Sequence, residues 1–172
     1  MDFIDHKTEL TKLVQDILTE AKQQGANQAD VSVSMDQGLG VRVRKGELEN
    51  LEFNQDRGFG ITLYFGQRKG SASTTDSSID AIRDTVKAAK NIAQHTQEDE
   101  CSGLADKALM PTQAMDLDLY HPWNIEPEEA TQLAIECEAA GLRVDDRLVN
   151  SDGAEVSTQQ GLRVYGNSHG FI

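Results

Sequence analysis

Metal-ligating side chains are few in this sequence, and their spacing does not build a site. The histidines are His6, His95, His121 and His169. None of them begins an H-E-x-x-H helix motif, and none pairs with another histidine or cysteine at helical ligand spacing. Cys101 and Cys137 are far apart and form no C-x-x-C motif. The sequence therefore predicts no metal site of its own, and each histidine is interpreted as a surface or capping residue.

Nucleophiles and phosphate-binding glycines are equally isolated. The candidate nucleophiles are Ser71, Ser73, Ser168 and Cys101. No G-x-S-x-G or Cys-His signature surrounds any of them. The candidate phosphate-loop glycines are Gly58, Gly60, Gly66 and Gly70. They match neither G-x-G-x-x-G nor a P-loop, so close backbone approach or sheet curvature explains them better. No catalytic, cofactor-binding or metal-binding residue is predicted.

Charged side chains offer two weaker candidates. Asp116 and Asp118 on an extended segment would point the same way and could bind a cation, although a solvated acidic edge is the stronger interpretation. A local basic cluster could contact a partner or an acidic peptide, although most charge on the outer face of a strand is only solvated. The cluster consists of Arg42, Arg44, Arg57, Arg68 and Lys69.

Composition narrows the classes of partner. The chain of 172 residues has 29 acidic and 16 basic residues and a net charge of −13. Such a surface repels phosphate backbones and anionic lipids, so we expect no direct nucleic-acid binding and no membrane binding. There is neither an apolar run of roughly 20 residues nor a secretory signal pattern, and we expect a cytoplasmic protein.

Hydrophobic periodicity predicts the elements that carry these residues. Apolar positions at helical spacing predict helices over 10–21 and 79–93, with Gly25 ending the first and Ser77 capping the second. A third helix is predicted from Pro127, with Ala130, Leu133, Ala134 and Cys137 on its inner face.

Alternating residues predict strands over 31–35 and 39–43 and through 51–73, and a hairpin around 152–153 leads to a last strand near 162–164. Between 98 and 129 the sequence predicts an extended surface segment that buries Leu117, Leu119, Tyr120 and Trp123.

The order of these elements predicts an α+β fold with a largely antiparallel sheet and helices packed on one face. The whole of residues 1–172 is expected to form a single N-terminal domain of a longer protein, because the last strand pattern is still running at Ile172.

Four separated blocks resemble the PmbA (TldE) branch of the TldD/PmbA family. They are GELENLEFNQDRGFGITLY, RKGSASTTD, DLDLYHPW and GLRVYGNSHGF, in the family's order. The resemblance implies a subunit that pairs with a TldD-type partner in a cytoplasmic metallopeptidase that degrades or processes peptides.

The resemblance also implies where the chemistry lies. In the family the H-E-x-x-x-H metal motif belongs to the TldD-type subunit, which is expected to hold a zinc-type metal. No position of this chain matches that motif, so the resemblance implies a non-catalytic part that shapes the substrate cleft or the subunit interface. The alternative is a regulatory module that binds DNA gyrase or another protein without proteolysis.

Overall fold

Two long strands joined by a tight hairpin form the centre of the fold. The computed structural model describes residues 3–113 and 115–172. Strand β1 covers Gln28–Arg44 and strand β2 covers Glu47–Phe65. The turn residues Lys45 and Gly46 have φ values of 54° and 75°. Positive φ at both positions is the type I′ geometry that suits a two-residue hairpin.

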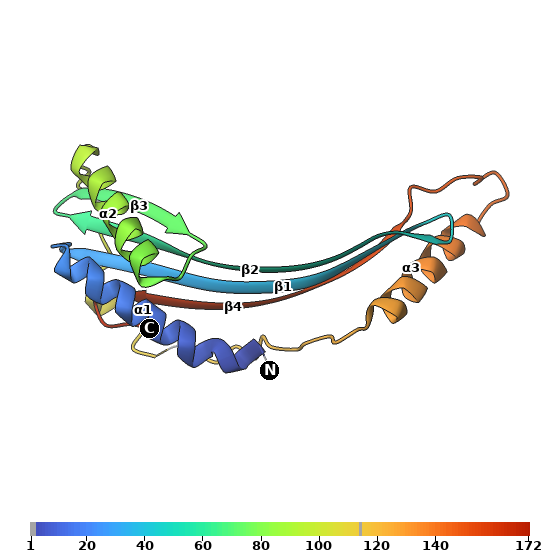
Figure 1. Cartoon of the computed structure of the whole chain (residues 1–172), viewed down its shortest axis with the longest axis horizontal. Coiled ribbons are helices and arrows are strands. Elements are labelled where there is room, and N and C mark those ends of the chain that lie inside the picture. Colours follow the sequence, from blue (N-terminus) through green and yellow to red (C-terminus); the bar gives the residue numbers. More distant parts are fainter. Residues whose placement is uncertain (1–2, 114) are drawn as a thin grey trace. The chain divides into compact units, whose positions relative to one another are not determined.

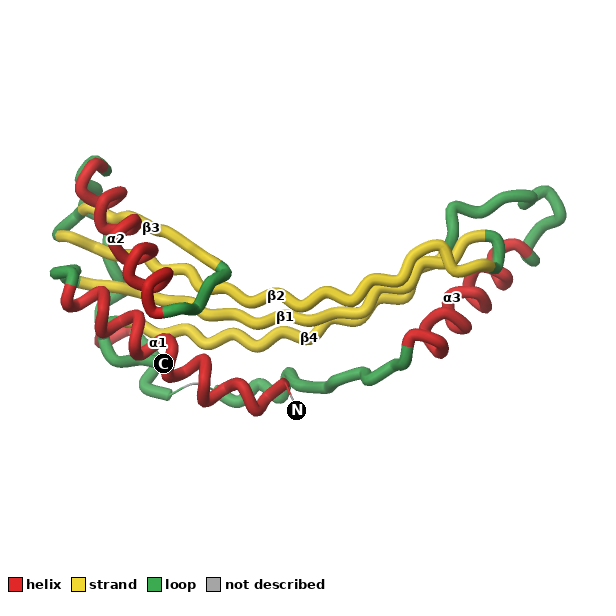
Figure 2. The backbone as a smooth tube through the Cα atoms, in the orientation of Figure 1, coloured by secondary structure: helices red, strands yellow, loops and turns green. Residues whose placement is uncertain are grey.

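Two further strands complete an antiparallel sheet. Strand β3 (Arg68–Thr74) pairs with β2, with Phe59 opposite Thr74 and Phe65 opposite Arg68. Strand β4 (Ala154–Asn167) pairs with the other side of β1, which gives the order β3-β2-β1-β4 (Figures 1 and 2). Together with three α-helices this sheet confirms the predicted α+β class.

The sequence suggested that Gly38 and Gly40 separate two strands, but β1 runs through both glycines. Hydrogen-bonded strands on either side of β1 explain why the glycines do not break it.

The helices are α1 (Lys7–Gln23), α2 (Ile79–His95) and α3 (Pro127–Leu142), with 3-10 turns at Phe3–His6 and Lys107–Leu109. Gly25, with φ of 88°, ends α1 as predicted. The amide of Ala26 donates to the carbonyl of Ala21 at 3.2 Å, which is the Schellman arrangement. The cap of α2 is Ser78 and not the predicted Ser77, because the Ser78 hydroxyl accepts the amide of Ala81.

The chain divides into two compact units. The first comprises Met1–Met35, Asp56–Leu117 and Leu162–Ile172, and the second comprises Asp36–Gln55 and Asp118–Gly161. The strands β1, β2 and β4 each contribute to both units. The expectation of a single domain over 1–172 stays a prediction.

In the first unit α1 and α2 cover one face of the sheet (Figure 1). The strand residues that bury toward them include Val31, Val33, Phe59, Ile61, Leu63 and Val164. The helices contribute Leu10, Val14, Ile17, Ala21, Ile82, Val86, Ala89 and Ala93. Period-two alternation predicts that Phe59, Ile61, Leu63 and Phe65 share the face that meets the helices; the first three are buried there and Phe65 is half-buried. Ile79, placed in the predicted stripe, is exposed because it is the first residue of α2.

In the second unit a smaller core joins the β1–β2 hairpin to α3. Its buried members are Val41, Val43, Ile125, Ala130 and Ala134. The predicted inner face of α3 is partly wrong, because Leu133 and Cys137 are exposed. The helix packs along the single row of Ala130, Ala134 and Glu138, each four residues from the next.

Glu138 is the buried acidic residue of that row, and its carboxylate holds the hairpin turn. Its two oxygens accept the amides of Lys45 at 2.9 Å and Gly46 at 2.8 Å. These backbone hydrogen bonds favour the ionised form and lower the pKa of Glu138 below its usual value of 4.5. The turn amides, which have no partner in the ladder, are thereby satisfied.

The substitution Glu138→Gln is expected to destabilise the protein at neutral pH, because an amide loses the charge that both turn amides bind. A lowered folded-state pKa contributes stability that is complete above the unfolded pKa and is lost as the pH falls through the folded one. The difference in melting temperature between wild type and variant should therefore be largest near neutral pH and should shrink as the pH falls through the lowered folded-state pKa. Glu136→Gln, on the exposed side of α3, is the matched control. A difference independent of pH would contradict the assignment.

Two further expectations about the second half of the chain are wrong. No strand precedes Gly153 between α3 and β4, so residues 144–153 form a loop in place of a hairpin arm. In the segment before α3, Leu117, Leu119 and Trp123 are exposed, whereas Ile125 is buried against the hairpin core. The sequence of this segment does not show which of its apolar residues packs against another part of the chain. Among the described residues, none of the helices has the length and apolar character needed to cross a bilayer.

Candidate functional site

The sheet of the first unit turns a polar face away from α1 and α2. Because side chains alternate along a strand, the neighbours of the buried residues point to this opposite side. We call it the polar face, and define it as Asp30, Ser32, Ser34, Gly58, Gly60, Thr62, Tyr64, Ser71, Ser73, Arg163 and Tyr165.

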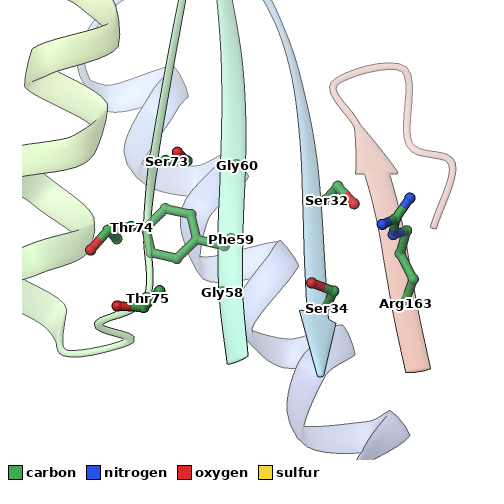
Figure 3. Close-up of a pocket in the computed structure, with 9 residues that line it drawn as sticks. All are labelled: Ser32, Ser34, Gly58, Phe59, Gly60, Ser73, Thr74, Thr75 and Arg163. Carbon is green, nitrogen blue, oxygen red and sulfur yellow. The ribbon is translucent and has the colours of Figure 1, made fainter. Parts of the chain in front are cut away.

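A shallow groove of about 700 Å³ is lined partly by this face. Figure 3 shows Ser32 and Ser34 on β1 beside Arg163 on β4, with Gly58 and Gly60 on the neighbouring β2. The remaining lining residues are Phe59, Ser73, Thr74 and Thr75. The groove therefore has small side chains over most of its lining and one cation at its side.

The glycines on the floor of the groove are not required by the fold around them. A Cβ at Gly60 would lie 4.0 Å from its nearest neighbour, the Cβ of Ser73. At Gly58 the nearest atom would be the Thr74 carbonyl oxygen at 3.4 Å, and neither glycine has the left-handed backbone that favours glycine. The two glycines leave the bottom of the groove free of side chains, so another backbone could approach the sheet closely there.

Next to the groove, Tyr64 and Asp30 form a hydrogen-bonded pair on the polar face. The Tyr64 hydroxyl donates to Oδ2 of Asp30 at 3.2 Å. Burial raises the pKa of Asp30, against hydrogen bonds from Tyr64 and Thr62 that lower it. Burial and the neighbouring Asp30 raise the pKa of Tyr64 to about 12. The Tyr64 hydroxyl therefore keeps its proton at neutral pH and donates a hydrogen bond to Asp30.

The histidines singled out in the sequence do not come together. His6 contacts Glu9 at 3.1 Å, and the His95 and His121 rings contact the carbonyls of Asn91 and Asp118. Within residues 3–113 and 115–172 no group of three or more His, Cys, Asp or Glu side chains is placed to hold a metal ion. The absence of a metal site in the whole chain stays a prediction.

The candidate nucleophiles have structural surroundings. The Ser71 hydroxyl lies 3.1 Å from that of Thr62, and the Ser168 hydroxyl accepts the amide of Ala29 at 3.0 Å. Ser73 lines the groove. Cys101 and Cys137 are exposed free thiols. In the part of the chain that the structure describes, no histidine ring is hydrogen-bonded to any of these serines.

The remaining candidates divide between the two units. Asp118 has a left-handed φ of 49°, so the backbone there is not the extended one on which Asp116 and Asp118 were expected to point the same way. The basic cluster is paired within the protein at its four arginines, whereas Lys69 has no ion pair among the described residues. Its ion pairs are Arg42–Glu49 (2.9 Å), Arg44–Glu49 (3.9 Å), Arg57–Glu9 (3.0 Å) and Arg68–Glu98 (3.4 Å). These arginines are therefore less available to a partner than the sequence suggested.

Arg163 is the groove residue that the sequence-based search missed. Its position between Leu162 and Val164 in an alternating strand indicates that its side chain points away from the buried face. The sequence could not show that the described residues place no carboxylate within ion-pair distance of it, because ion pairing depends on contacts between distant segments.

Two family models match most of the chain. Residues 29–93 match the PmbA/TldA metallopeptidase domain 1, and residues 120–172 match the PmbA/TldA metallopeptidase central domain. Among curated relatives, the chain is 46% identical over 164 residues to a metalloprotease PmbA homolog of Haemophilus influenzae, covering 95% of this chain and 36% of the relative. It is 47% identical over 155 residues to metalloprotease PmbA of Escherichia coli O157:H7, covering 90% and 34%.

Solved structures show the same fold. A Bacteroides thetaiotaomicron protein described as a candidate modulator of DNA gyrase superimposes with a TM-score of 0.78 at 22% identity, over 95% of this chain and 37% of that one. TldE from Thermococcus kodakarensis gives a TM-score of 0.72 at 13% identity, over 92% and 35%. The chain thus spans about a third of the length of these relatives. On the two family models and the curated relatives, it belongs to the PmbA/TldD metallopeptidase family and corresponds to the N-terminal part of a PmbA-type protein.

Proposed function

We propose that this chain is the N-terminal part of a non-catalytic PmbA-type subunit in a cytoplasmic TldD/PmbA metallopeptidase complex, and that its polar face borders the peptide cleft. The observation that carries the second part is the open groove floored by Gly58 and Gly60. A glycine floor lets an extended peptide backbone lie close to the sheet, and the flanking hydroxyls offer donors and acceptors to its amides.

The catalytic metal belongs in this proposal to the TldD-type partner. The described residues do not fit a metal, because they contain no cluster of three or more suitable ligands. A zinc-type ion in the partner would supply the hydrolytic chemistry. The role of this chain would be to orient an unfolded or processed peptide and to limit access of water to it.

The test uses the full-length protein with its TldD-type partner. A pull-down measures assembly, and chelator-sensitive cleavage of an unfolded reporter peptide measures activity. The variant Gly60→Leu places a large side chain on the groove floor, at a position where a Cβ would meet no atom closer than 4.0 Å. We expect it to lower kcat/KM by about tenfold or more while the complex still forms. Gly141→Leu, whose Cβ would meet nothing within 4 Å, is the control for a bulky residue at a glycine elsewhere in the chain.

Unchanged cleavage by the Gly60→Leu complex would contradict the placement of the polar face at the cleft. Loss of the complex together with activity would instead make this face a subunit contact.

A second candidate function is a regulatory module that binds DNA gyrase or another protein without proteolysis. The net charge of −13 is compatible with a basic protein surface, and a structural relative is described as a candidate gyrase modulator. Co-purification with gyrase in the absence of any chelator-sensitive cleavage would favour this function. No direct contact with nucleic acid is proposed in either case.

A further inference from the structure

Arg163 stands out among the arginines of this acidic protein. Six of the described arginines lie within 4.0 Å of a carboxylate: Arg42, Arg44, Arg57, Arg68, Arg83 and Arg147. Among residues 3–113 and 115–172, Arg143 and Arg163 are the arginines without such a partner. Most of the described arginines are therefore paired, and Arg163 is one of the two that are not. Arg163 differs from Arg143 because it lines a groove.

The lining around Arg163 is suited to an anionic group. None of the nine residues that line the groove is acidic. Ser32 lies beside the guanidinium, Ser34 lies farther along the same strand with its hydroxyl directed toward β2, and Gly58 and Gly60 leave the adjoining floor free of side chains (Figure 3). The carboxylate of Asp30 on the same face is already hydrogen-bonded by Tyr64. A ligand carboxylate would therefore find donors here without a facing negative charge.

We propose that this groove binds a carboxylate of an extended peptide substrate, with the Arg163 guanidinium as its ion-pair partner and the Ser32 and Ser34 hydroxyls as additional donors. Guanidinium presents paired N–H donors that match the two oxygens of a carboxylate. The inference rests on the proposed function, since it requires the peptide to cross the polar face. The carboxylate has two sources, an acidic side chain within the peptide or its free C-terminus.

The experiment measures binding separately from cleavage, with the full-length protein in complex with its TldD-type partner. Three fluorescein-labelled short peptides of the same length are compared by fluorescence anisotropy. The first has one internal glutamate and an amidated C-terminus, the second is neutral with a free C-terminus, and the third is neutral and amidated. Tighter binding of the first or of the second peptide identifies the source of the carboxylate.

Arg163→Gln is expected to weaken the binding of the preferred carboxylate peptide by about three- to tenfold and to leave the binding of the neutral amidated peptide unchanged. Raising the salt from about 50 mM to about 500 mM should shrink the difference between the peptides in the wild type, because the ion pair is partly exposed. Arg163→Lys should retain part of the preference, since it keeps the charge but loses the paired donors. Arg143→Gln is the matched control and should change nothing.

An equal effect of Arg163→Gln on all three peptides, or no effect on any, would overturn the inference. Loss of the partner subunit from the Arg163→Gln complex would also overturn it, because an acidic residue of the partner would then be the occupant. The proposed function fails separately: it is contradicted if the wild-type complex shows no chelator-sensitive cleavage, whatever the anisotropy shows. Arg163 is exposed, and unchanged melting curves for both Arg163 variants confirm that each binding result reports on a folded protein.

Discussion

Gly70→Ala is expected to cost at least about 3 kcal/mol in the free energy of unfolding, a large fraction of the roughly 5–15 kcal/mol that stabilises an ordinary domain. Gly70 lies in β3 directly beneath α2 and is buried. A Cβ there would overlap the carbonyl oxygen of Ala89 and lie 2.5 Å from the amide nitrogen of Ala93. Both obstacles are helix backbone, so no side-chain rotation can relieve them, and α2 would have to move off the sheet.

The matched control is Gly60→Ala in the adjacent strand, where a Cβ meets nothing closer than 4.0 Å. This change should be nearly neutral, because it removes backbone freedom from the unfolded chain without a clash in the folded one. Urea denaturation of the two variants measures the difference. Equally small effects would show that β3 and α2 are not in backbone contact.

Ile61→Ala is expected to cost about 2–5 kcal/mol as a truncation in the core. Ile61 is 2% exposed on the inner face of β2, opposite Ala72 of β3. Loss of its side chain leaves a cavity between the sheet and the helices, because the neighbouring side chains of a close-packed core relax only partly to fill it. The expected result is a lower denaturation midpoint with an unchanged slope.

The neighbouring Thr62→Ala tests the opposite face of the same strand. Thr62 is half-buried, and its hydroxyl contacts that of Ser71 at 3.1 Å. Its loss should cost far less than the loss of Ile61, since a partly solvated hydrogen bond contributes about 1 kcal/mol. Small, equal midpoint shifts for both variants would contradict the burial of one face of β2 against the helices.

Local patterns in the sequence were sufficient for most of the elements. The alternation from Phe59 to Leu63 determined which strand residues bury, because period-two alternation is a property of the strand itself. The helix stripe of α1 and its end at Gly25 were likewise readable, since each depends on residues within one or two turns. Separated sequence blocks also indicated the family.

Contacts between distant segments decided the rest. Glu138 belongs to the buried row of α3 because the hairpin turn 93 residues earlier in the chain presents an amide to it. Which apolar residues of 117–125 bury likewise depended on the partner surface available to each. Nothing near Gly70 in the sequence reveals that α2 passes against it, and nothing near Arg163 reveals the groove beside it.

The physical reason is the range of the interactions. Periodicity and turn chemistry act between residues a few positions apart, and therefore leave a trace in the local sequence. Steric contact, ion pairing and groove shape depend on which segments the tertiary fold brings together. The sequence by itself thus determined most of the strands and helices and the family of this protein, whereas the tertiary structure alone decided where Gly70, Glu138 and Arg163 act.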